Sequence, residues 1–136
     1  MTANLVNPAR RSQFQVFVMP NLYGDIITDE AAQIQGGVGT AGSGNLGDKY
    51  CMFEAIHGSA PRMIEEGRGK YANPCSMFKA SEMMLRHIGY IEKADKLAKA
   101  LEICNDTERK YVITGRDGGA TCEEFGNYVM ETVSSL

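Results

Sequence analysis

The chain has 136 residues, 43% of them hydrophobic and 23% charged, and a formal net charge of −3, values that suit one globular domain. The densest positive stretch, Lys93, Lys96 and Lys99, alternates with acidic residues and fits a solvated helix face rather than a nucleic-acid footprint. No apolar run approaches the length of a transmembrane helix. We therefore expect neither nucleic acid nor a membrane as a partner.

The first half of the chain predicts a short helical piece, a buried strand, a helix, a glycine-rich loop and a second strand. These fall at residues 1–11, 14–19 (FQVFVM), 25–35, 36–47 and 50–56 (YCMFEAI). The helical piece is expected to stop near Pro8, and Gly24 is expected to open the longer helix. Six glycines in twelve positions predict the loop, and dense apolar runs predict the strands.

The second half predicts a turn, a polar loop, two amphipathic helices, a short strand or extended piece, a second turn and a last helix. These fall at residues 57–61, 62–71, 73–89, 91–104, 110–114, 115–119 and 121 onward. Thr121 is expected to cap the last helix, with Glu124 as its capping-box partner. Strands that alternate with helices indicate the α/β class. Two clear strands are few for an independent sheet, which suggests a piece of something larger.

The four cysteines are widely spaced, and neither they nor the two histidines form a zinc pattern. No secretory signal precedes them, and three of them lie beside apolar residues. We therefore expect free thiols and a cytoplasmic location.

Two carboxylates, Asp25 and Asp29, lie four residues apart on a predicted helix and therefore share one of its faces. Both are expected in the first turns, where the helix dipole favours negative charge. Such oxygen ligands suit Mg²⁺ or Mn²⁺, which usually take one or two protein carboxylates. The alternative is local helix capping, which the spacing alone favours.

Four signatures follow one another along the chain: NLYGDIITD with the glycine-rich segment after it, FEAIHGSAP, ANP and MMLRHIG. Together they resemble the isocitrate and isopropylmalate dehydrogenases, metal-dependent and nicotinamide-linked enzymes that oxidise and decarboxylate 2-hydroxyacids. The resemblance covers nearly the whole chain. It implies an α/β part of an isopropylmalate-dehydrogenase-like fold, with few strands and flanking helices. It also implies that Asp25 and Asp29 bind Mg²⁺ or Mn²⁺.

The resemblance further implies a nucleotide site that differs from the usual G-x-G-x-x-G fingerprint, which residues 36–47 do not fit. A His-Gly-Ser/Thr-Ala-Pro loop and a later asparagine would hold the adenosine half, with a glutamate near the nicotinamide ribose. The matching residues are Glu54, His57, Gly58, Ser59, Ala60, Pro61 and Asn73. Judged without the resemblance, His57 fits an ordinary turn residue, Asn73 a helix cap and Glu54 a surface acid.

The choice between NAD and NADP depends on two arginines. Arg62 follows the loop where NAD-linked relatives usually carry an acid, and a cation there suits the 2′-phosphate of NADP. Arg116 could join it, although both arginines also fit a solvated surface. The tyrosines that NADP-linked relatives often carry nearby are absent, since Met63 and Gly115 stand in those places. The resemblance slightly favours NADP and leaves NAD open.

Relatives are more than twice this length. By resemblance, residues 1–136 are a partial, C-terminal segment of a single dehydrogenase domain, and the N-terminal half is absent. That half would supply the catalytic acid and base, most substrate contacts and a third metal-binding aspartate, so no catalytic residue is assigned here. Met1 would then be an internal methionine of a longer reading frame or the start of a truncated product. The complete protein is expected to be a homodimer.

The segment MMLRHIG resembles isocitrate dehydrogenases more than isopropylmalate dehydrogenases. Among the hydroxy-di- and tricarboxylate substrates of the family, this resemblance implies isocitrate, as in the tricarboxylic acid cycle. Isopropylmalate, homoisocitrate and tartrate-type substrates stay open. A catalytically silent truncated or regulatory subunit is a further alternative. An unrelated small α/β protein would require four ordered signatures to coincide by chance.

Overall fold

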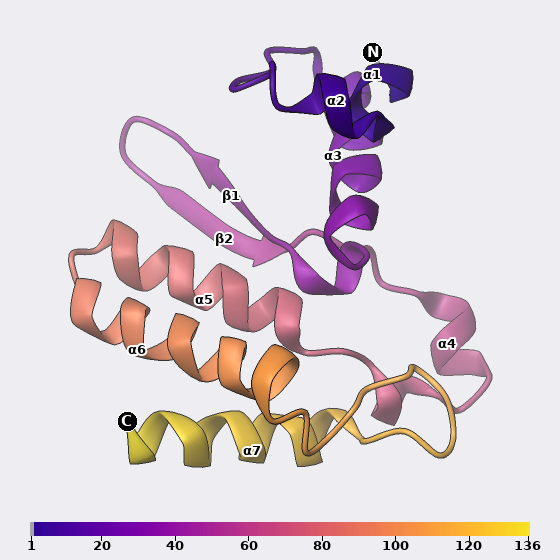
Figure 1. The fold of residues 1–136 in the computed structure, drawn as a ribbon, viewed down its shortest axis with the longest axis vertical. Coiled ribbons are helices and arrows are strands. Elements are labelled where there is room, and N and C mark those ends of the chain that lie inside the picture. Colours follow the sequence, from indigo (N-terminus) through magenta and orange to yellow (C-terminus); the bar gives the residue numbers. More distant parts are fainter. Residues whose placement is uncertain (1) are drawn as a thin grey trace. The chain divides into compact units, whose positions relative to one another are not determined.

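The computed structural model describes residues 2–136, which divide into two compact units, one up to Val38 and one from Gly39 to Leu136. Figure 1 shows the helices and the β-hairpin in chain order. No helix of the described residues is long and apolar enough to cross a membrane.

Three helices make up the first unit. They are α1 (Thr2–Val6), α2 (Pro8–Arg11) and α3 (Asn21–Gln35). α1 packs against α2 and α3, and the buried apolar residues of this unit are Leu5, Ile27 and Ala32. Pro8 begins α2 instead of ending a helical piece, because a proline at the first helical position has no hydrogen bond to lose. Asn7 caps α2, accepting a hydrogen bond from the backbone of Ala9.

The strand predicted at residues 14–19 is wrong. The segment is irregular, and Val16 and Val18 are 79% and 94% exposed. A strand needs a neighbour for its backbone hydrogen bonds. The sheet in the described residues contains only β1 (Gly42–Leu46) and β2 (Cys51–Ala55), so this segment has no strand partner there.

α3 begins earlier than predicted, at Asn21, directly after Pro20. Asp25 and Asp29 therefore lie beyond the first turn, which contains no acidic residue. The prediction that the helix dipole favours negative charge at these two residues is wrong, because that effect fades within the first turn. The helix ends as predicted at Gly36, whose φ of 129° is a conformation that other residues rarely adopt.

A hairpin and most of the helices belong to the second unit, which also contains shorter helical turns. Its elements are β1, β2, α4 (Pro61–Glu65), η2 (Gly69–Tyr71), α5 (Cys75–His87), α6 (Ile91–Glu102), η3 (Ile103–Thr107) and α7 (Cys122–Ser135), and η1 (Val38–Thr40) precedes β1. Both strands lie against α5, α5 packs along α6, and α6 packs against α7 (Figure 1). The prediction that residues 62–71 form only a polar loop is therefore wrong, because most of α4 and all of η2 lie in this segment.

β2 confirms the predicted second strand, whereas β1 lies inside the predicted loop. The strands are antiparallel, and Gly42 pairs with Ala55. A glycine-rich strand is possible here because β1 approaches α5 so closely that a Cβ on Gly42 would lie 2.6 Å from the backbone nitrogen of Ala80. The buried Ser76 hydroxyl strengthens this contact by donating to the carbonyl of Ala41 and accepting from the N–H of Ile56.

The main core lies between α5, α6, η3 and α7. Its buried members are Cys75, Leu101, Cys104, Phe125, Tyr128 and Val129. Residues 110–114 form no strand, although Tyr111 and Ile113 pack on this core from an extended segment. The predicted capping box is confirmed, because the Thr121 hydroxyl accepts from the Glu124 N–H and the Glu124 carboxylate accepts from the Thr121 N–H.

Candidate functional site

Asp25 and Asp29 are both exposed on α3, one helical turn apart. Neither carboxylate caps the helix, because the capping residue is Pro20 and no side chain bonds to the helix start. The capping alternative is therefore wrong for both residues. Neither carboxylate forms an ion pair among the described residues, whose five salt bridges involve other acids. Two accessible carboxylates thus share one face of α3.

The pair fits part of a hard-cation site. Side chains one helical turn apart have Cβ atoms about 5–6 Å from each other. Mg²⁺ usually takes one or two carboxylates and completes its shell with water or substrate oxygens. The described residues hold no group of three or more His, Cys, Asp or Glu side chains placed around one ion. The described part of the chain therefore presents two candidate ligands, and the other positions of such a site would be left to water, substrate or another polypeptide.

The His57–Pro61 loop directly follows β2, so the hairpin fixes where it begins. His57 Nδ1 lies 2.9 Å from the carbonyl oxygen of Gly58. Because a carbonyl can only accept, Nδ1 donates this hydrogen bond, which leaves Nε2 as the ring nitrogen open to another partner. Ala60 adopts a left-handed conformation with φ of 47°, which is unfavourable for a residue with a side chain. Strain of this kind often accompanies ligand-binding loops.

Asn73 has a structural role, as its position before a helix suggested. Its side-chain oxygen accepts a hydrogen bond of 2.9 Å from the backbone N–H of Cys75 at the start of α5. The amide nitrogen of Asn73 is not used in this bond, so a second role remains open to it. Glu54 lies exposed on β2 and accepts a hydrogen bond of 2.8 Å from the side chain of Asn45 on β1.

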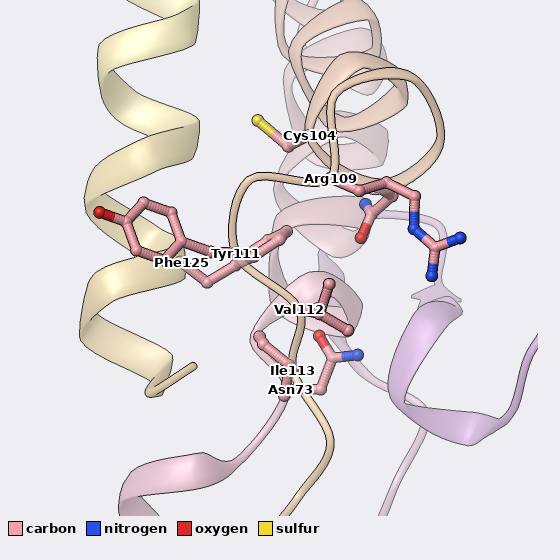
Figure 2. A pocket seen from close by; sticks show the side chains of 8 residues that line it. Asn73, Cys104, Arg109, Tyr111, Val112, Ile113 and Phe125 are labelled. Atoms are coloured by element: carbon pink, nitrogen blue, oxygen red, sulfur yellow. The ribbon is translucent and has the colours of Figure 1, made fainter. Parts of the chain in front are cut away.

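Asn73 also lines a cavity of about 140 Å³ (Figure 2). The side chains around it come from the start of α5, from η3, from the segment after η3 and from α7. They are Asn73, Cys104, Asn105, Arg109, Tyr111, Val112, Ile113 and Phe125. Small-molecule sites usually measure about 300–1,000 Å³, so this cavity is too small to enclose a nucleotide. The sequence gives little sign of it, because its lining includes Arg109, whose φ of 51° is left-handed, and residues of the π-helical turn η3.

Arg62 is exposed, with 88% of its side chain accessible, and is held through one nitrogen. Its Nε donates to Glu66 at 2.7 Å. Arg68 donates to the other oxygen of Glu66 and, at 2.9 Å, to the carbonyl of Gly115. Hydrogen bonds from Arg62 and Arg68 hold the pKa of the Glu66 carboxyl below its usual range. The outer nitrogens of Arg62 have no partner among the described residues.

Arg116 lies in a turn that is anchored on both sides. Gly115 is held by Arg68, and Asp117 accepts a hydrogen bond of 2.6 Å from the hydroxyl of the buried Tyr71. This bond from Tyr71 also lowers the pKa of the Asp117 carboxyl. The sequence pattern missed these anchors, because Arg68 and Tyr71 stand in a segment that its composition describes only as polar.

The predicted residues fall in both units. Asp25 and Asp29 belong to the first, whereas Glu54, the His57–Pro61 loop, Arg62 and Asn73 belong to the second. Within the second unit, the loop connects β2 directly to α4, which carries Arg62 in its first turn.

Comparison with known proteins identifies the family of this chain. The family model described as isocitrate/isopropylmalate dehydrogenase matches residues 1–129. The isocitrate/homoisocitrate dehydrogenase of Thermus thermophilus is 40% identical over 127 residues, which are 93% of this chain and 36% of that protein. The isocitrate dehydrogenase (NADP) of Rickettsia typhi is 51% identical over 87 residues, 64% of this chain and 17% of that protein.

Among solved structures, the isocitrate dehydrogenase from Methylococcus capsulatus superimposes with a TM-score of 0.84 at 32% identity, covering 97% of this chain and 38% of that chain. This likeness confirms the expected class, part of a dehydrogenase fold with few strands and flanking helices. The chain spans little more than a third of the Thermus and Methylococcus proteins. On the family match and the identities together, the chain belongs to the isocitrate/isopropylmalate dehydrogenase family.

Proposed function

We propose that this chain is the C-terminal part of a metal-dependent, NAD(P)-linked dehydrogenase that oxidises and decarboxylates isocitrate. The observation that carries the proposal is the pair Asp25 and Asp29, exposed, one turn apart and free of capping or ion-pair duties among the described residues, in a chain that belongs to this family. Exposed carboxylates with no structural partner are available for a cation.

In this proposal Asp25 and Asp29 hold Mg²⁺ or Mn²⁺. A bound divalent cation supplies Lewis acidity toward the hydroxyl and carboxylate oxygens of a 2-hydroxyacid. The two aspartates orient that cation and balance its charge. In this proposal proton transfer falls to residues of the longer protein outside this chain, as the family resemblance implies.

The second unit carries the nucleotide contacts in this proposal. His57 is exposed and its Nε2 is not used in the bond to Gly58, so this nitrogen can accept from the exocyclic amine of adenine, and Asn73 can offer its amide nitrogen. Glu54 suits a ribose hydroxyl. The outer nitrogens of Arg62 suit a 2′-phosphate, which favours NADP over NAD. The longer protein would work as a homodimer whose second copy completes the metal site.

Mn²⁺ titration of this chain, followed by the electron paramagnetic resonance signal of the free ion, tests the proposal. Asp25→Asn and Asp29→Asn should each weaken Mn²⁺ binding by about tenfold, because each removes one of two anionic ligands. Asp48→Asn is the matched control, since Asp48 is an exposed aspartate on the hairpin loop. Repeating the titration in the presence of NADP and of NAD tests the preference for NADP. Equal effects of the two nucleotides on Mn²⁺ binding would refute that preference.

Equal Mn²⁺ affinity in the wild type and all three variants would remove the metal assignment.

The isolated chain should not reduce NAD or NADP with isocitrate and Mn²⁺. Turnover by these 136 residues would show that the acid and base lie within them after all. In the longer protein, Asp25→Asn should abolish metal-supported turnover and leave the fold largely intact. Full activity combined with lost Mn²⁺ binding would contradict the proposed role of the ion.

A further inference from the structure

A thiol and an imidazole meet on the second unit, at residues that have no part in the proposed nucleotide contacts. Cys51 begins β2 and His87 ends α5, and Cys51 Sγ lies 3.2 Å from His87 Nε2. The two residues are 36 positions apart, so only the packing of the hairpin on α5 brings them together. Phe53, on the same face of β2 as Cys51, holds the imidazole ring with centroids 5.4 Å apart.

Cys51 is the most accessible of the four free cysteines. Cys75 and Cys104 are 3% and 0% exposed, and Cys122 is partly buried, whereas Cys51 is exposed. Burial also raises the pKa of the Cys75 thiol, which keeps it protonated. A reagent in solution therefore meets Cys51 first, and among the four thiols it is the one for which a hydrogen bond to an imidazole is found.

The position of His87 suits a proton acceptor. It is the last residue of α5, where the carbonyl ends of the helix favour a positive charge. A thiol attacks only as the thiolate, so a base within hydrogen-bond distance assists the attack directly. The ring is held by Phe53 and exposed to solvent, so the proton it takes up can pass on to water.

We propose that Cys51 is a thiol-modification site, with His87 as its base, that reacts with low-molecular-weight disulfides. The Cys51 proton passes to His87 Nε2, and the sulfur attacks one sulfur of the disulfide. A mixed disulfide forms on Cys51, and the second sulfur leaves as a thiolate that takes up a proton. A free thiol reverses the reaction. This site is independent of the dehydrogenase proposal, because none of its residues is assigned to the metal or the nucleotide.

The test is reaction of the intact chain with an aromatic disulfide that releases a coloured thiolate. We expect one fast-reacting thiol, located at Cys51 by peptide mapping and absent from Cys51→Ser. His87→Ala should slow the fast phase on the order of tenfold, since it removes the base. Imidazole added to the buffer should restore much of the rate in His87→Ala and leave the wild type nearly unchanged. His87→Gln serves as a second variant that keeps a polar side chain at the helix end.

Fast reaction at Cys122 instead of Cys51 would overturn the proposal, as would an unchanged rate in both His87 variants. A slowed His87→Ala that imidazole fails to restore would give His87 a packing role only, and would also overturn it. Circular dichroism of each variant shows whether α5 and the hairpin remain folded. If His87→Ala unfolds, the rate of His87→Gln decides: a wild-type rate refutes the base, and a slowed rate supports it.

Discussion

Replacing Gly42 by alanine should separate the hairpin from α5. The added Cβ would lie 2.6 Å from the backbone nitrogen of Ala80 and 2.9 Å from the carbonyl carbon of Lys79, and ordinary contact begins at 3.4 Å. Both obstacles are backbone atoms, so no side chain can rotate away. β1 and α5 must therefore move apart by about 0.8 Å, the difference between the closest contact and the ordinary limit.

Overpacking of this kind costs about 1–3 kcal/mol. The movement also stretches the hydrogen bonds through which Ser76 holds Ala41 and Ile56, and losing one such bond costs about 1 kcal/mol. The loss of unfolded-state freedom on replacing glycine offsets about 0.4–1 kcal/mol. We expect Gly42→Ala to lower the free energy of unfolding by about 1–4 kcal/mol, as the balance of these effects.

The assay is urea unfolding followed by far-ultraviolet circular dichroism, with Gly126→Ala as the matched control. Gly126 lies within α7, and a Cβ there would meet no atom within 4 Å. The same substitution should therefore raise the free energy of unfolding by about 0.5–1 kcal/mol, since alanine favours a helix interior. If Gly42→Ala matches the wild type or Gly126→Ala, the close approach of β1 to α5 is refuted.

Two further predictions concern α7. Thr121→Ala should cost about 1 kcal/mol by removing the hydroxyl that caps the helix. Hydrogen bonds from the Thr121 N–H and hydroxyl lower the pKa of the Glu124 carboxyl from its ordinary 4.5. The stability that the ionised Glu124 carboxylate contributes is therefore complete above its ordinary pKa, and it is lost as the pH falls through the lower pKa of the folded state. The difference between wild type and Thr121→Ala in urea midpoint should shrink from neutral pH to about pH 3, and an unchanged difference would contradict the coupling. Tyr128→Phe should cost about 1–2 kcal/mol, because the buried hydroxyl donates to Glu108 at 2.5 Å. Burial raises the pKa of Tyr128, so in a strongly alkaline absorbance titration the wild type should keep one more un-ionised tyrosine than the variant. Identical titrations of the two proteins would refute the buried environment of Tyr128.

The candidate site was predictable in part. Asp25 and Asp29 were identified by a four-residue spacing, and that spacing holds whether α3 begins at Asn21 or later. Their separation from the helix start was not predicted, because α3 begins directly after Pro20, which lies outside the helix with a ψ of 152°. The anchors of the turn around Arg116 were also missed, since Arg68 reaches Gly115 across 47 positions of sequence. Contacts at that range leave no local pattern.

Local signals account for the longer helices of the second unit. Apolar spacing placed α5 and α6, and Thr121 with Glu124 marked the start of α7, because periodicity and caps act within a few residues. Strands behave differently. β1 exists because Gly42 lets the chain approach α5, and residues 14–19 and 110–114 form none although their composition favours strands. A strand is completed by hydrogen bonds to a distant partner, so composition can indicate that a segment would suit a sheet, while the packing of the folded chain settles whether a partner lies beside it.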